Sequence, residues 1–263
     1  MPINSPAVLY RGNPQYGATT VVRTVTTAAL TSNLVTLTFG SNHGLTQVGT
    51  LINVQGVGAA YDGLFPVHSF PGLNQATYVV TSGNIGSAAV TPNGSAIFNS
   101  GVTVGGSISN VAIVNFTALV STGAAHNLAI GDIVRVNTGN VGIDGTWVVT
   151  STPSASIFTF TSTTQTLAST AITQGAFGEA PSVYTVPAAT QAVVTNIIIA
   201  NPTASTINVS VTLDQMAVAK QVSIAANQST FIDLKQVLDA TRRIFVLASV
   251  PQVDVQISGM LVV

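Results

Sequence analysis

The sequence contains no cysteine, and only 6% of its 263 residues are charged. An average soluble domain carries about 25% charged residues, so the polarity of this chain comes mainly from uncharged hydroxyl and amide side chains. Without cysteine the chain can form neither a disulfide framework nor a thiolate metal site. So few charges are unusual for a monomeric enzyme and are typical of a protein whose surface is covered by neighbouring subunits.

Clustered positive charge and long apolar runs are also missing. The formal net charge is -1, and the basic residues are scattered except for Arg242-Arg243. This pattern excludes the electrostatic footprint of a nucleic-acid-binding protein. No apolar run reaches the roughly 18 residues that a membrane helix needs, and the N-terminus lacks the basic start of a signal peptide. We therefore expect no direct nucleic-acid binding and no membrane span.

Motifs of known enzyme chemistry are absent as well. The sequence has no G-x-S-x-G, H-E-x-x-H or P-loop pattern. Glycine is frequent at Gly105-Gly106 and over residues 139–145, but no helix is expected after either segment, so turns are predicted there rather than phosphate-binding loops. No acidic run resembles a calcium loop. We expect no catalytic residue, no metal and no cofactor.

What the sequence does contain is an internal repeat. Residues 34–80 and 111–161 carry the same features in the same order. The matching pairs are His43-Gly44-Leu45 with His126-Asn127-Leu128, Gly49 with Gly131, Asp62-Gly63 with Asp144-Gly145, and Tyr78 with Phe160. Such repetition predicts two copies of one small β module.

The repeated histidines, His43 and His126, are the residues most easily mistaken for catalytic or metal-binding groups. Because both follow a predicted strand at the same point of the repeat, we interpret them as turn residues whose imidazole bonds the backbone. His68 has no counterpart in the second copy and is expected at the surface or between sheets. Trp147 and Phe65 occupy matching positions at the start of a strand, where a core role is expected.

The repeated Asp-Gly pairs have a similar interpretation. Asp62-Gly63 and Asp144-Gly145 each stand between two predicted strands, and these residues tolerate the positive φ that tight turns need. A carboxylate pair for acid-base catalysis is the alternative. We favour the turns, because each aspartate belongs to a turn of its own module.

The chain is predicted to be all-β. We expect an extended N-terminal arm over residues 1–20, two tandem small sandwich or barrel-like modules over 21–101 and 102–181, and a C-terminal jelly-roll-like β-sandwich over 182–263. One helical turn, over Leu234–Ala240, is the only helical segment expected.

Two segments are candidate interfaces. The arm contains the apolar residues Val8, Leu9 and Tyr10, so it either lies on another subunit or folds back on its own domain. Arg242 and Arg243 either form a polar contact across a subunit boundary or cap a turn.

The repeated segments resemble the small β modules of tailed-bacteriophage virion proteins, in which His-Gly-Leu, Gly-Asp and Asp-Gly-Thr-Trp precede an aromatic strand. The second copy keeps Gly131-Asp132 and Gly145-Thr146-Trp147 but has Asn127 in place of glycine. The first keeps Gly44 but has Thr50 in place of aspartate and Leu64-Phe65 in place of Thr-Trp.

The C-terminal segment from Tyr184 is similar to the β-sandwich domains of phage tail, baseplate and accessory head proteins, although Thr241–Ile244 replaces their usual Gly-Asp-x-Ile turn. The resemblance implies a virion location, other virion proteins as partners and a homo-oligomer. It favours a tail or baseplate component, with head decoration or neck close behind.

Two other functions remain as alternatives. A receptor-binding or carbohydrate-binding module of a tail fibre would need an exposed aromatic platform. With one tryptophan and 6% aromatic residues, the sequence offers little material for it. A tail-associated hydrolase would need a convergent acid pair, which the repeat does not provide.

Overall fold

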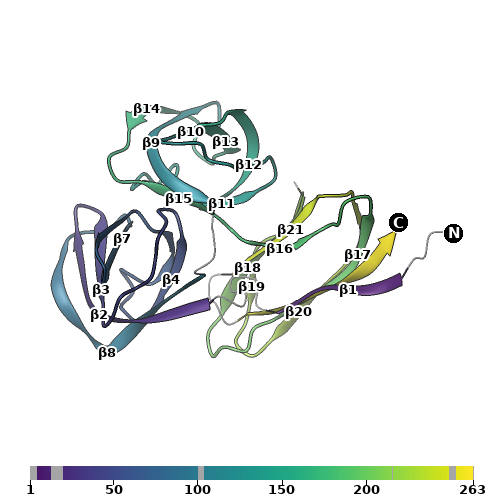
Figure 1. Cartoon of the computed structure of the whole chain (residues 1–263), viewed down its shortest axis with the longest axis horizontal. Coiled ribbons are helices and arrows are strands. Elements are labelled where there is room, and N and C mark those ends of the chain that lie inside the picture. The colour runs from purple at the N-terminus through teal and green to yellow at the C-terminus, as the bar shows by residue number, and fades with distance from the viewer. Residues whose placement is uncertain (1–4, 13–19, 100–103, 215, 249–252, 263) are drawn as a thin grey trace. The chain divides into compact units, whose positions relative to one another are not determined.

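The computed structural model describes the following residues of the chain: 5–12, 20–99, 104–214, 216–248 and 253–262. Over these residues it contains 22 β-strands and no helix, so the predicted all-β class is confirmed (Figure 1). None of the described residues therefore lies in a helix long and apolar enough to cross a membrane.

Two compact units make up the chain, and each is described by itself. One unit, Ala18–Glu179, holds both copies of the repeat, and the other joins Met1–Gly17 to Ala180–Val263. Of the expected modules 21–101 and 102–181, residues 21–179 thus belong to a single compact unit, and residues 180 and 181 belong to the other. The expected C-terminal sandwich includes the N-terminal residues.

The first copy of the repeat, module 1, is a seven-stranded antiparallel sheet with the order β5-β4-β8-β2-β3-β7-β6. Its strands are β2 (Thr20–Thr31), β3 (Leu34–Phe39), β4 (Leu51–Gln55), β5 (Gly63–Pro66), β6 (Ser69–Gly72), β7 (Gln75–Val79) and β8 (Ile85–Asn99). Every second residue of β3 is buried, as expected for a strand with one face on a core. Val25, Leu37 and Phe98 are fully buried in that core.

The second copy, module 2, has the strand order β10-β13-β12-β11-β15-β9-β14. Its strands are β9 (Gly105–Val114), β10 (Thr117–Thr122), β11 (Ile133–Asn137), β12 (Gly145–Ser154), β13 (Ile157–Thr161), β14 (Leu167–Ala171) and β15 (Ala176–Glu179). Because β10 also pairs with β9, six strands close into a barrel. Ile113, Phe158 and Phe160 fill its interior.

The two modules share one topology. Strand β12 corresponds to β5 and β6 together, which are separate strands on either side of Val67 and His68. β12 runs across that point and pairs with both β11 and β13. Strand β8 corresponds in the same way to β14 and β15, because β8 pairs with β2 and β4 while β15 pairs with β9 and β11. The repeat in the sequence is therefore a repeat in strand pairing.

Tight turns join the first two strands of each module. Ser32 and Asn33 in module 1 have φ values of 52° and 66°, and Asn115 and Phe116 in module 2 have values of 48° and 64°. Positive φ at both central residues is the geometry of the hairpin turn that matches strand twist. Asparagine tolerates this conformation better than most residues, which explains its presence in both turns.

Glycines allow the two modules to approach backbone to backbone. A Cβ on Gly178 would overlap the carbonyl oxygen of Gly49, and a Cβ on Gly105 would lie 2.9 Å from the Gly49 backbone. Nearby, the side-chain amide of Asn137 donates to the carbonyl of Val79 across the same contact, at 3.2 Å. No residue with a side chain fits at these glycine positions without movement of the backbone.

The turn predicted at Gly105-Gly106 is wrong. Both residues lie in strand β9, where they pair with Gly178 and Phe177 of β15. The reason is the close approach of Gly49, which requires glycine inside a strand rather than at a bend.

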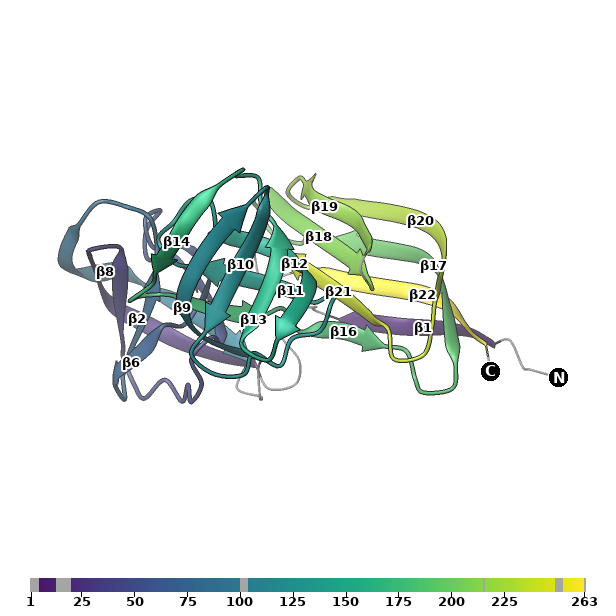
Figure 2. The same cartoon turned by 90° about the horizontal axis from the view of Figure 1, so that it is seen from above.

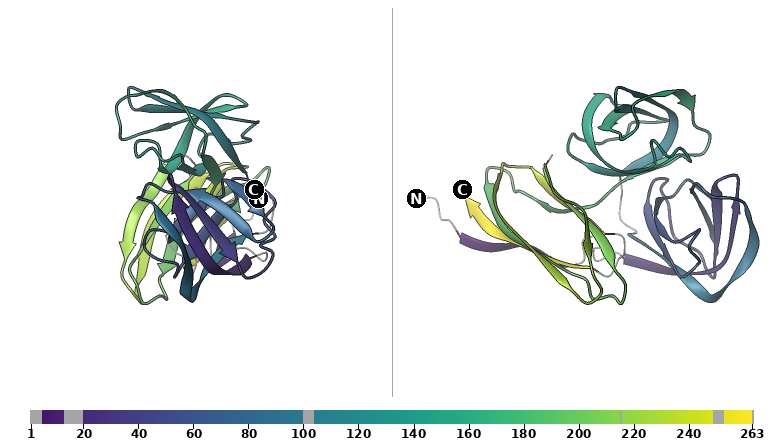
Figure 3. Two further views of the ribbon diagram at one scale, coloured as in Figure 1. Left: turned by 90° about the vertical axis from the view of Figure 1, so that its left-hand side faces the viewer. Right: turned by 180° about the vertical axis from the view of Figure 1, so that it is seen from behind.

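The other unit is a sandwich of two four-stranded sheets, with the orders β1-β22-β17-β20 and β16-β21-β18-β19. Its strands are β1 (Ser5–Gly12), β16 (Ser182–Thr185), β17 (Gln191–Ala200), β18 (Ile207–Leu213), β19 (Met216–Ile224), β20 (Ser229–Leu238), β21 (Arg243–Ala248) and β22 (Asp254–Val262). Figure 3 shows the two sheets face to face. Ile197, Val211 and Val246 are fully buried between them.

The strand order of this sandwich is that of a jelly roll. When its eight strands are numbered along the chain, the sheets have the orders 1-8-3-6 and 2-7-4-5. Eight strands in two such sheets form the paired Greek keys of the jelly-roll fold, so the predicted architecture is confirmed.

The N-terminal arm supplies the first of these strands. Residues 5–12 form β1, which pairs antiparallel with β22 of the same chain. Leu9 is buried in the sandwich core, Tyr10 is half-buried with its pKa raised by burial, and Val8 is 60% exposed. An extended arm laid on another subunit is therefore wrong for residues 5–12, because Leu9 completes this core; residues 1–4 and 13–19 lie outside the described residues.

The helical turn expected over Leu234–Ala240 is also wrong. Residues up to Leu238 continue strand β20, in which exposed and half-buried positions alternate from Ser229 to Val237. A period of two places one face of this segment on the core, and that packing overrides its weak helical pattern.

Candidate functional site

His43 is held in place by two hydrogen bonds within module 1. The ring is buried, and its Nδ1 accepts a hydrogen bond from the backbone N–H of Leu45, at 2.9 Å. Because Nδ1 is an acceptor, the proton of the neutral ring is on Nε2, which donates to the carbonyl of Gly72 at 3.1 Å. Both ring nitrogens are therefore used to join the turn after β3 to the end of β6.

His126 repeats this arrangement in module 2. Its Nδ1 accepts from the backbone N–H of Leu128 at 2.9 Å, and its Nε2 lies 3.0 Å from the carbonyl of Ser154. The ring is as buried as that of His43. Neither histidine has a ring nitrogen left to bind a metal or to transfer a proton.

Asp62 holds the loop between β4 and β5. Its carboxylate accepts hydrogen bonds from the backbone N–H groups of Gly56, Val57 and Gly58, at 2.9 to 3.2 Å. Gly63 follows with a φ of 146°. The Asp-Gly pair thus ends a longer connection rather than forming a two-residue hairpin turn.

Asp144 does the same between β11 and β12. It accepts from the backbone and hydroxyl of Thr138 and from the backbone N–H of Gly139. Burial raises the pKa of Asp144 above its ordinary value, and these hydrogen bonds and the charge of Arg135 oppose the rise. Gly145 follows with a φ of 154°.

The aromatic residue after each Asp-Gly pair lies in a stacked pair. Trp147 stacks on Phe160 with ring centroids 4.7 Å apart, and its indole N–H donates to the carbonyl of Ile143 at 2.7 Å. In module 1, Phe65 stacks on Tyr78 at 4.4 Å. Trp147 is thus half-buried and is held against Phe160 by the stacking and by its hydrogen bond.

In module 1 the hydroxyl of Tyr78 makes the hydrogen bond that the indole of Trp147 makes in module 2. It donates to the carbonyl of Tyr61, which is the counterpart of Ile143, at 2.6 Å. His68 donates its backbone N–H to the carbonyl of Thr77, next to Tyr78, at 2.7 Å. Its side chain is half-buried, and burial lowers its pKa.

Arg242 and Arg243 make contacts within their own unit. Arg242 forms an ion pair with Asp214 at 3.2 Å, which ties the β20–β21 connection to the end of β18. The guanidinium of Arg243 lies 5.1 Å from the ring centroid of Phe245.

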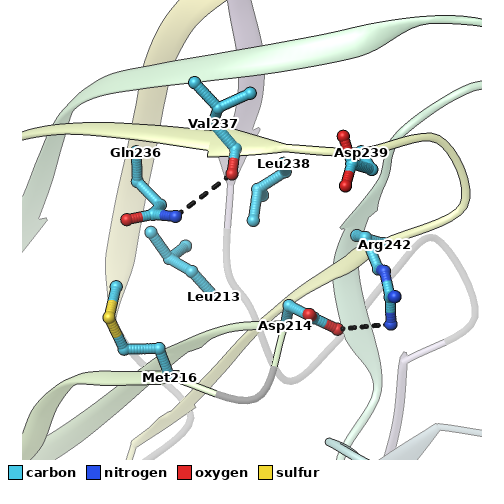
Figure 4. Close-up of a pocket in the computed structure, with 8 residues that line it drawn as sticks. All are labelled: Leu213, Asp214, Met216, Gln236, Val237, Leu238, Asp239 and Arg242. Carbon is cyan, nitrogen blue, oxygen red and sulfur yellow. Dashed lines mark hydrogen bonds and ion pairs between the residues drawn. The ribbon is translucent and has the colours of Figure 1, made fainter.

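A cavity of about 420 Å³ opens beside this ion pair (Figure 4). Its carboxylates, Asp214 and Asp239, are engaged by Arg242 and by the side-chain amide of Gln191. The apolar residues that line it are Leu213, Met216, Val237 and Leu238. Both carboxylates that line the cavity therefore have partners within this unit.

Beside His126, a second cavity of about 370 Å³ is lined by Asn127, Thr152 and Ser154 as well as the histidine. No other titratable side chain lines it. Over the described residues, no group of three or more potential metal ligands is found.

No protein-family model matches the chain, and no curated protein matches it. Among solved structures, the endosialidase of phage phi92 is 16% identical over 67% of this chain, with a TM-score of 0.26, and the chain spans only 30% of that protein. Two structures of infectious bursal disease virus, one of the Gx strain and one of the T13 viral particle, each contain a chain similar to this one. The identities are 9% and 10%, and the TM-scores are 0.24 and 0.23. The matches cover 98% and 95% of this chain and 73% and 71% of the viral chains. Similarities of this size assign the chain to no family.

Proposed function

We propose that the chain is a non-enzymatic structural component of a tailed-phage virion, and that a tail or baseplate position is favoured over a neck or head-surface position. One observation carries the proposal. The polar side chains that the repeat preserves, His43, His126, Asp62 and Asp144, all bond backbone groups of their own module. Residues preserved for the shape of a loop support a role as a building element rather than as a catalyst.

The composition and the fold support the same role. The chain contains only two lysines, and few other charges discourage association. Jelly rolls are common in viral capsid proteins, although this support is an analogy between folds. The sequence resemblance to phage virion modules points in the same direction.

The arrangement of aromatic residues does not favour carbohydrate binding. Phe116 and Phe231 are the described phenylalanines that are largely exposed, and they belong to different units. Trp147 and Tyr78 are held inside module 2 and module 1. A sugar-binding face would gather such rings on one set of loops.

The direct test is the composition of purified virions. We expect this chain in stoichiometric amounts in particles purified from cells that produce it, and density for the jelly roll in a map of those particles. Particles that assemble and infect normally without the chain would contradict the proposal.

A further inference from the structure

Strand β20 leaves one of its long edges open. It is the last strand of the sheet β1-β22-β17-β20 and pairs with β17 only, so none of the described residues bonds its other edge (Figure 2). At the opposite end of this sheet, β1 contains Pro6 and a register shift between Val8 and Tyr10. Proline cannot donate to a further strand, so it blocks strand addition at that edge. β20 contains no proline and the exposure of its residues alternates, and its pairing with β17 shifts register once, between Val194–Gln236 and Asn196–Asp233.

The outer face of β20 has a symmetric pattern of side chains. Phe231 is 65% exposed and Val237 is 50% exposed, and the exposed residues Asp233 and Lys235 lie between them. The order along the strand is therefore apolar, acidic, basic, apolar. The carboxylate of Asp233 is held on this face by the side-chain amide of Asn196 at 2.7 Å.

This order is complementary to itself when it is reversed. In an antiparallel pair of two β20 strands with Leu234 opposite Leu234, Asp233 of each copy faces Lys235 of the other. Phe231 of each copy then faces Val237 of the other. Both directly opposed pairs are of the kind that stabilises antiparallel sheets, and the arrangement has the two-fold symmetry of most homodimers.

Other registers are disfavoured by the same residues. A shift by two residues places Asp233 opposite Asp233 in one direction, and Lys235 opposite Lys235 in the other. Like charges directly opposite each other destabilise a strand pair. A shift by one residue turns the apolar residues of one copy to the wrong face. The two charges therefore specify a single register.

The inner face of β20 also gains cover in this register. Ile232 and Leu234 are only half-buried at the edge of the sandwich core. Ile232 of the second copy would lie opposite Gln236, whose side chain lines the cavity together with Leu213 and Met216 (Figure 4). Pairing would thus place an apolar side chain beside the apolar part of this cavity and exclude water from it.

We propose that the partner of β20 is β20 of a second copy of the chain, and that two copies form a two-fold dimer with a continuous eight-stranded sheet. The inference rests on the proposed function in one respect, which is that a structural protein is expected to associate with other copies of itself. Its test in solution is independent of any particle, so the dimer and the virion location can fail separately.

Charge reversal on the full-length protein tests the register. In Asp233→Lys two lysines would face two lysines, and in Lys235→Asp two aspartates would face two aspartates. We expect each single variant to dimerise with a Kd at least about tenfold higher than the wild type in sedimentation equilibrium at low salt. The double variant D233K/K235D exchanges the charges and should restore the wild-type Kd.

Mixing supplies a second measurement. D233K and K235D, each weak alone, should form a mixed dimer with each other, because every lysine then faces an aspartate. Both positions are exposed, so folding is checked by the circular dichroism and melting temperature of each variant. A monomeric wild type, or single variants that dimerise as tightly as the wild type, would overturn the proposal. A mixture that forms no mixed dimer would overturn it as well.

Discussion

Corresponding strands pair in the same way in module 1 and module 2, but matching positions carry different residues. Where module 1 has Val22 and Ile97 on neighbouring strands, module 2 has the paired glycines Gly105 and Gly178. The cause is Gly49 of module 1, whose backbone lies against these two glycines. The repeat therefore keeps the pairing of corresponding strands, and its two copies differ where module 1 contacts module 2.

The stacked aromatic pairs differ in a second way. Both modules have a donor to the loop carbonyl before the Asp-Gly pair, but Trp147 donates from β12 in module 2 and Tyr78 donates from β7 in module 1. The donor changes strand while the accepting carbonyl keeps its place. What is preserved is the hydrogen bond rather than the residue that makes it, because a buried carbonyl without a donor is costly.

The largest effect is expected where the modules touch. In Gly178→Ala the new Cβ would overlap the carbonyl of Gly49 and lie 2.9 Å from the side chain of Leu51. We expect the free energy of unfolding of this unit to fall by about 3–5 kcal/mol, or the two modules to unfold separately. Urea denaturation followed by the fluorescence of Trp147, the one tryptophan, measures this.

Gly86→Ala is the matched control for that variant. A Cβ on Gly86 would meet no atom within 4 Å, so the same substitution in strand β8 should change stability by less than about 0.5 kcal/mol. If Gly178→Ala and Gly86→Ala were equally stable, the glycine contact would not hold the modules together.

The sequence predicted the modules because turn residues recur at fixed positions along the chain. His43, Asp62 and their counterparts act on atoms within about 30 residues, and such local roles leave a visible pattern. The tight turns at residues 32–33 and 115–116 were missed, because they contain neither Asn-Gly nor Asp-Gly.

The features that were missed in the rest of the molecule depend on distant partners. Strand β1 pairs with residues near the other end of the chain, and nothing within Ser5–Gly12 specifies that partner. The glycines of β9 have a role only once Gly49 is placed against them. The open edge of β20 was hidden because the segment around Leu234 has a weak helical pattern. Pairings between distant segments are not visible in local periodicity.

A smaller effect is expected from the aromatic pairs. Trp147→Phe leaves the carbonyl of Ile143 without its donor and also removes part of the ring stacked on Phe160. We expect a loss of about 3 kcal/mol in the free energy of unfolding, measured by chemical denaturation.

Adding Phe160→Tyr to that variant copies the aromatic pair of module 1 into module 2. The new hydroxyl should donate to Ile143 as Tyr78 donates to Tyr61, and it should recover about 1 kcal/mol. A double variant that is less stable than Trp147→Phe alone would show that the two pairs are not interchangeable.

The histidine turns should respond equally in the two modules. His43→Ala and His126→Ala each remove the acceptor of one backbone N–H and the donor to one carbonyl. We expect each substitution to cost about 2 kcal/mol, as measured by thermal and chemical unfolding. A large cost in one module and none in the other would break the equivalence of the two turns.

The smallest effect is expected from the charge of Asp144. Because burial raises its pKa, Asp144 contributes most to stability at pH values below its unfolded pKa, and this contribution is lost as the pH rises through the folded pKa. Asp144→Asn carries no such charge. Its amide loses a hydrogen bond at every pH, so the quantity to compare is how the difference in melting temperature between the two proteins changes with pH. The melting temperature of the wild type relative to Asp144→Asn should fall as the pH rises from about 3 to about 7.

Thr138→Val should enlarge this slope. The hydroxyl of Thr138 donates to Asp144 at 2.8 Å and lowers its pKa, so its removal lets burial raise the pKa further. Comparing the wild type, Asp144→Asn, Thr138→Val and the double variant at each pH separates the effect of the charge from the effect of lost packing. A constant difference in melting temperature between the wild type and Asp144→Asn across this pH range would contradict the prediction. Burial of the loop in module 2 would then have no effect on its carboxylate, and the two Asp-Gly loops would differ in exposure alone.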